Sequence, residues 1–154
     1  MNRLADGLRL ALLSPEVVAA LAPFALLAFA PDWSSVIERS MKGGVGFGLS
    51  AAGLVLAACA FCYKEGGEVI DPTGPRAALL EWPHYYMLKA RVVGSLVWCV
   101  LGVACVLVAT WMVAADVVPH FAGALLVSGV LAPATAVATV ALARYRIREL
   151  LSQN

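Results

Sequence analysis

Three long apolar runs without a charged side chain decide what this chain can fold into. They cover residues 44–63, 92–115 and 121–143. Each has the length of about 20 residues that a helix needs to cross a hydrocarbon core of about 30 Å. Backbone groups in that core find no water to bond, so each run must close its hydrogen bonds within a helix. The sequence therefore predicts three membrane-spanning helices.

The composition agrees with a membrane protein. Of the 154 residues, 62% are hydrophobic and 14% are charged, whereas a soluble domain usually has about 25% charged residues. The mean hydropathy is +0.85. The formal net charge of +1 gives no reason to expect nucleic acid as a partner. We therefore expect one all-α integral membrane domain over residues 1–154, with the lipid bilayer as its immediate partner.

A fourth and weaker span is expected over residues 10–30. Residues 14–16 (Ser-Pro-Glu) form a helix start, with a hydroxyl N-cap, a proline in the first turn and an acid near the positive end of the helix dipole. Pro23 interrupts the stretch that follows, so a kinked span, a re-entrant helix and an interfacial helix stay open. Residues 28–30 resemble a signal-peptide cleavage site, but Pro31 follows them and favours an uncleaved span.

The four spans pair as two hairpins in a four-transmembrane-helix bundle. Residues 31–43 are expected to form a loop and residues 116–120 a tight turn, while residues 64–91 form the only long connection, a cytoplasmic loop in which Gly66 and Gly67 favour a turn. The approximate spans are 10–30, 44–63, 92–115 and 119–143.

The distribution of lysine and arginine sets the orientation. The segment before the first span holds two of the eleven, the long loop four and the C-terminal tail three, while the first loop holds the other two. Because cytoplasmic segments carry the excess of these residues, we expect an N-in, C-in arrangement with both termini in the cytoplasm. The Ala-, Val- and Leu-rich composition is compatible with a bacterial inner membrane.

Small residues gather at the start of the second span, where they recur at four-residue spacing. Small side chains let two helix backbones approach closely in lipid. This face therefore predicts a helix contact, either within the monomer or with a second copy or a partner helix. Its members are Gly44, Gly46, Gly48, Ser50 and Gly53.

Aromatic and basic residues gather at the inner ends of the third and fourth spans. They form either a membrane anchor with stop-transfer charge or a docking face for anionic lipid or a soluble partner. This juxtamembrane face comprises Trp82, His84, Tyr85, Tyr86, Lys89, Arg91, Arg144, Arg146 and Arg148.

Cys59 and Cys62 form a CxxC pair, which resembles the reactive pairs of four-helix thiol-oxidising membrane proteins. In those proteins the pairs face the oxidising side, whereas the charge distribution places Cys62 at the reducing cytoplasmic face. We therefore expect these thiols to act as small buried apolar groups. No metal site is expected, because His84 and His120 fall on opposite sides of the membrane.

No arrangement of nucleophile, paired carboxylates or metal ligands is evident, so we expect neither catalytic residues nor a cofactor. The three apolar runs lack Asp, Glu, Lys, Arg and His, which disfavours a proton-coupled transporter. The expected function is that of an interaction protein without catalytic activity, which recognises a second copy or a membrane-protein partner, as toxin-immunity proteins, phage-defence membrane proteins and accessory subunits do. A subunit of an oligomeric channel or transporter is the alternative, and a membrane thiol-disulfide oxidoreductase that uses Cys59 and Cys62 is the second alternative.

Overall fold

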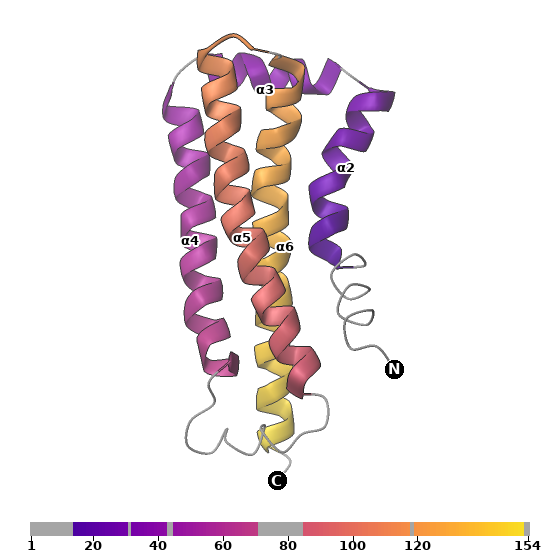
Figure 1. Ribbon diagram of the computed structural model, residues 1–154, viewed down its shortest axis with the longest axis vertical. Helices are drawn as coiled ribbons and strands as arrows, with labels where there is room; N and C mark the ends of the chain where they lie inside the picture. The colour runs from indigo at the N-terminus through magenta and orange to yellow at the C-terminus, as the bar shows by residue number, and fades with distance from the viewer. Residues whose placement is uncertain (1–13, 31, 43–44, 71–84, 118, 153–154) are drawn as a thin grey trace.

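The chain is helical in every element of the computed structural model, which describes residues 14–30, 32–42, 45–70, 85–117 and 119–152. Figure 1 shows α2, α4, α5 and α6 running along the long axis of the molecule and α3 lying across one end of them. An all-helical fold is thus confirmed. The helices are α2 (Pro15–Phe29), α3 (Asp32–Lys42), α4 (Val45–Ile70), α5 (Tyr85–Ala114) and α6 (Pro119–Ser152).

Helices α4, α5 and α6 are long and apolar enough to cross a membrane. Their outward surfaces carry large apolar side chains such as Leu54, Val100 and Leu131, an arrangement that suits lipid contact rather than water. Helix α2 rises only about 22 Å at 1.5 Å per residue. It qualifies only together with α3, to which it is joined by a bend of 108°. Three, or up to four, apolar helices therefore indicate a multi-pass membrane protein.

Helix α6 is the centre of the bundle, because it contacts α2, α3, α4 and α5. Its tightest contact is with α5, at Gly102. A Cβ atom at Gly102 would lie 2.7 Å from the carbonyl oxygen of Gly129 and would also collide with the ring of Pro133. Proline has no N–H, so Pro133 also leaves the Gly129 carbonyl without its usual helical donor. Glycine at these two positions is what lets the two backbones come together.

The first connection is a helix, so the prediction of a loop over residues 31–43 is wrong. In α3, Ser34, Ile37 and Met41 recur every three or four residues, the spacing of one helix face. Met41 packs against Ala109 and Leu126 at the end of the bundle. The charged residues between them had suggested a solvated connection, but their spacing makes α3 an amphipathic helix that covers the bundle end.

Helix α4 is longer than the apolar run that predicted it. It continues through Gly66 and Gly67, where a turn was expected, and ends at Ile70. Two contacts stabilise this extension: Gly66 lies directly against Val92 of α5, and the Tyr85 hydroxyl donates to the carbonyl oxygen of Ile70 at 2.8 Å. The hydroxyl thereby satisfies one of the carbonyls that a helix end leaves unpaired.

The expected loop over residues 64–91 is consequently shorter than predicted. Residues 64–70 belong to α4, and residues 85–91 belong to α5. Residues 71–84 lie outside the described part of the chain, as do residues 10–13 of the first expected span.

A tight turn joins α5 to α6, as predicted. Asp116 adopts a positive φ of 54°, and the N–H of Val117 donates to the carbonyl of Met112 at 2.9 Å. This is a Schellman ending, in which a left-handed residue stops the helix. The Asp116 carboxylate also binds the Lys42 ammonium at 2.9 Å and so ties the end of α3 to the turn.

Candidate functional site

A carboxylate lies in the interior of the bundle. Helix α2 begins with Ser14 and Pro15, and Glu16 in its first turn is only 1% exposed. Its Oε1 accepts a hydrogen bond from the Ser95 hydroxyl of α5 at 3.0 Å. The hydroxyls of Ser14 and Thr139 also lie close enough to this carboxylate to interact with it. Three parts of the chain thus surround a single acidic group with donors.

This carboxylate lies inside the apolar region rather than at its surface. Ser95 follows the start of the apolar run 92–115 by three residues, and Thr139 precedes the end of the run 121–143 by four. These offsets place the Glu16 partners about 5–6 Å below the ends of the runs. Ionisable groups at such positions are costly and commonly have a function.

Sequence reasoning had assigned Glu16 only to a helix start. That assignment is correct for the local structure, since the Ser14 hydroxyl accepts from the N–H of Val17 at 3.4 Å. The burial of Glu16 could not be predicted, because the hydroxyls that surround its carboxylate lie on helices much later in the chain. The available signal was an acid at the start of the one weakly apolar span.

Further contacts hold α2 along the central helix. The hydroxyl of Ser128 donates to the carbonyl oxygen of Ala20 at 2.7 Å. One turn further along α2, the rings of Phe24 and Phe121 lie 6.3 Å apart, within the range of favourable aromatic pairs. Helix α2 is therefore anchored at both ends.

Three thiols meet between α4 and α5. Cys62 and Cys99 are buried beside Ala136 and Val140 of α6, and Cys59 packs against them. Cys99 thus lies in the same cluster as both members of the CxxC pair. All four cysteines are free thiols. In the described residues no group of three His, Cys, Asp or Glu side chains has the geometry of a metal site.

The predicted glycine face of α4 splits into two sides. A Cβ atom at Gly48 would lie 2.7 Å from the Thr110 hydroxyl oxygen, so this glycine packs within the monomer. Gly46 and Gly53 have no atom of the described chain within 4 Å of their Cβ positions. Ser50 is also exposed, and its hydroxyl donates back to the Gly46 carbonyl at 2.8 Å. Gly44 lies outside the described residues.

Two shallow apolar grooves follow the crevice between α4 and α6. The first, with a volume of about 390 Å³, lies beside Phe47, Ser50 and Leu131. The second, with a volume of about 340 Å³, lies beside Ala57 and Phe61. Leu54 and Val130 line both of them. Because they share these two residues, the two grooves adjoin each other on the outside of the bundle, and we call them together the α4–α6 groove.

The predicted juxtamembrane face does not form a single cluster. Arg144 pairs with Glu65 of α4, and Tyr85 bonds to the end of α4. Arg146 lies 3.6 Å from Glu149 on its own helix. The side chains of Tyr86, Lys89, Arg91 and Arg148 are exposed at the same end of the bundle, whereas Trp82 and His84 lie outside the described residues.

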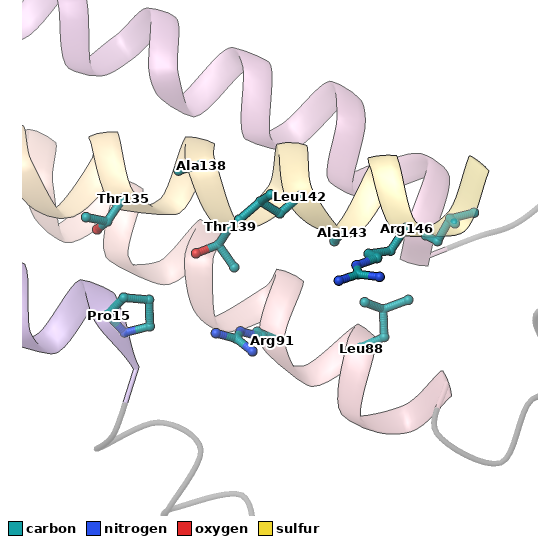
Figure 2. A pocket seen from close by; sticks show the side chains of 10 residues that line it. Pro15, Leu88, Arg91, Thr135, Ala138, Thr139, Leu142, Ala143 and Arg146 are labelled. Carbon is teal, nitrogen blue, oxygen red and sulfur yellow. The ribbon is translucent and has the colours of Figure 1, made fainter. Parts of the chain in front are cut away.

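A third groove opens at this basic end, between α2, α5 and α6. Its volume is about 480 Å³. Figure 2 shows Arg91 of α5 and Arg146 of α6 lining the groove, with Thr139 near Arg91 and Pro15 of α2 at the end farther from Arg146. We call it the arginine groove. Its inner wall reaches the residues that surround Glu16, since Pro15 and Thr139 adjoin both.

Comparison of the chain with protein-family models, with curated proteins and with solved structures finds no match.

Proposed function

We propose that this protein is a membrane interaction protein that recognises a transmembrane helix through the side of α4 that faces away from the bundle. We define this outer face by Gly46, Ser50, Gly53, Ala57 and Ala60, all of them exposed. They recur every three or four residues over about four turns. The buried side chains of α4, such as Val55 and Cys62, lie on its opposite side.

The observation that carries the proposal is the difference between glycines of the same molecule. Gly48, Gly66, Gly102, Gly123 and Gly129 all lie against neighbouring atoms of the bundle, whereas Gly46 and Gly53 do not. In lipid, small residues promote association because they let helix backbones approach closely. A row of small residues that makes no helix contact within the monomer is therefore suited to pack against a second helix, from another copy or from a partner protein.

Large side chains frame this outer face. Leu49, Leu54, Leu56 and Phe61 are exposed on its two flanks, so the small residues form a shallow furrow between apolar ridges. The α4–α6 groove adjoins the ridge formed by Leu54 and Phe61. A partner helix seated in the furrow would gain van der Waals contact with both ridges.

The proposal includes a location and an orientation. Helix α2 begins and α6 ends at the same end of the bundle (Figure 1), and Lys89, Arg91 and Arg148 lie there. By the positive-inside rule this end faces the cytoplasm. Four spans, with α2 and α3 together as the first, and a bacterial inner membrane complete the proposed arrangement.

Leucine substitutions on the two sides of α4 test the proposal. Gly53→Leu should weaken association and leave thermal stability unchanged, because its Cβ position is empty. Gly48→Leu should lower stability, since it meets Thr110. Leu54→Ile, which keeps volume, is the control.

Association is read by crosslinking of a single cysteine at Ala57, in a background without native cysteines, with the bands identified by mass spectrometry. A product between copies identifies self-association, and a product with another membrane protein identifies a partner. Crosslinking that persists unchanged in Gly53→Leu would place the interface elsewhere and contradict the proposal.

The buried carboxylate supports a second candidate, a subunit of an oligomeric channel or transporter. An acid in the membrane surrounded by hydroxyls is a common element of ion and proton pathways. Purified protein in liposomes should then conduct protons or cations, and Glu16→Gln should abolish the flux. Liposomes that stay as tight as protein-free ones would exclude this candidate.

A further inference from the structure

We infer that the arginine groove binds an anionic phospholipid, with the phosphate held between Arg91 and Arg146 and an acyl chain along α6. This binding site is independent of the outer face of α4, because it lies between α2, α5 and α6. The inference rests on the charges of the groove, on the character of its walls and on its depth in the membrane.

The charges favour a phosphate. Arg91 has no carboxylate partner among the described residues, and Arg146 is held only loosely, at 3.6 Å from Glu149 with 79% of its side chain exposed. Arg144, two residues before Arg146 on α6, differs because it is already paired with Glu65. Two guanidinium groups on different helices are therefore available to one ligand. Arginine binds phosphate oxygens through parallel N–H donors, which makes it well suited to this role.

The walls favour a lipid over a soluble anion. On the hydrocarbon side of the arginines the groove is lined by Ala138, Leu142 and Ala143 of α6. These side chains offer an acyl chain a continuous apolar surface, and among the described residues only the hydroxyls of Thr135 and Thr139 add polar groups to this part of the groove. A small soluble anion would leave this surface unused.

The depth of the groove matches the position of a phospholipid in a bilayer. Arg91 directly precedes the apolar run 92–115, and Arg146 follows the run 121–143 by three residues. Both guanidiniums therefore lie at the level where the hydrocarbon gives way to headgroups. Basic pockets between helices at this level bind anionic headgroups in membrane proteins.

Paired substitutions with equal changes of charge test the inference. The full chain in mild detergent is mixed with phosphatidylglycerol or phosphatidylcholine, and bound lipid is measured by native mass spectrometry together with the thermal unfolding temperature. The site variant is Arg91→Gln with Arg146→Gln. The control is Lys89→Gln with Arg148→Gln, which removes two charges from the same helices outside the groove.

We expect the wild type to prefer phosphatidylglycerol and to be stabilised by it. The site variant should lose about ten-fold or more in phosphatidylglycerol affinity, as expected for hydrogen bonds to a charged group, while the control should change by about five-fold or less. Ala138→Trp, which fills the apolar part, should also weaken binding. Glycerol phosphate, the headgroup without acyl chains, should give no stabilisation.

Three results would overturn the inference. Equal losses in the site and control variants would mean that the lipid responds to diffuse surface charge. Unchanged affinity in the site variant or in Ala138→Trp would show that lipid does not occupy the groove. Stabilisation by glycerol phosphate equal to that by phosphatidylglycerol would identify a soluble anion as the ligand. Gel filtration of each variant confirms that it remains folded.

Discussion

At the scale of single residues, Glu16 and Gly102 contribute most to the structure. Glu16 brings a carboxylate into the bundle and accepts a hydrogen bond there from Ser95 of α5, with the Thr139 hydroxyl of α6 close by. Gly102 contributes by having no side chain, since any Cβ would separate α5 from α6. Glu16 thus fixes α2 to the bundle, and Gly102 sets the distance between α5 and α6.

Removing the Glu16 carboxylate should loosen α2. Glu16→Ala leaves the buried Ser95 hydroxyl without its acceptor, and we expect a loss of about 1–3 kcal/mol in the free energy of unfolding. Glu16→Gln keeps an acceptor and should cost less. The measurement is unfolding in mild detergent. Glu149→Ala, at a half-exposed acid on α6, is the control and should change stability by less than about 1 kcal/mol. Wild-type stability in Glu16→Ala would show that the carboxylate is not needed to hold α2.

Adding one methyl group to Gly102 should be costly. Gly102→Ala places Cβ against Gly129 and Pro133, and we expect a loss of about 1–3 kcal/mol, typical of overpacking. Gly94→Ala on the same helix has free space and should be neutral or stabilising by up to about 1 kcal/mol. The two variants are compared by thermal unfolding. Equal stability would mean that α5 and α6 are separated more widely than described.

At the scale of helices, hydropathy predicted the spans but not their ends. The apolar runs were sufficient for α4, α5 and α6, because lipid permits few structures other than helices. The extension of α4 past Gly66 and Gly67 could not be predicted, since it depends on Val92 and on the Tyr85 hydroxyl. The burial of Glu16 depends on Ser95, which lies 79 residues along the chain.

Other features were present in the sequence and were not recognised. The three- to four-residue spacing of Ser34, Ile37 and Met41 is a helical signal that the neighbouring charges obscured. The split of the glycine face could be anticipated only in part, because Gly48 lies on the opposite side of a helix from Gly46 and Gly53. The packed structure was needed to show that the Gly48 side of α4 faces Thr110.

The end of α4 should fray when its cap is removed. Tyr85→Phe deletes the hydroxyl that binds the carbonyls of Val69 and Ile70, and we expect a local loss of about 0.5–1.5 kcal/mol. Hydrogen–deuterium exchange over residues 66–70 should quicken accordingly. Tyr86→Phe is the matched control, since its ring is exposed. Equal exchange in both variants would show that another contact holds this end.

At the scale of the whole molecule, two opposite ends can be distinguished. Helix α3 covers one end, where Lys42 and Asp116 join it to the turn between α5 and α6. The other end is open and basic and contains the arginine groove. Trp111 is exposed near the α3 end, and Tyr86 and Tyr145 are exposed near the basic end, as expected of aromatic residues at membrane boundaries.

The orientation of these ends can be tested by fusions. Alkaline phosphatase joined after Val118 should be active, and a green fluorescent protein joined after Asn154 should fluoresce, because the α3 end is expected outside and the basic end inside. A phosphatase that is inactive after Val118 and active after Asn154 would reverse the orientation. It would also place the arginine groove in the other leaflet.

The hydrogen bonds of α2 also bear on the order in which the chain is synthesised. Ser95 leaves the ribosome 79 residues after Glu16, and Ser128 follows Ala20 by 108 residues. A carboxylate alone in hydrocarbon is unfavourable. We therefore expect that α2 does not insert stably into the lipid until α5 and α6 have been inserted. The first of the described helices therefore reaches its final position last, and in a nascent chain halted before residue 95 the Glu16 carboxylate of α2 would still lack its Ser95 partner.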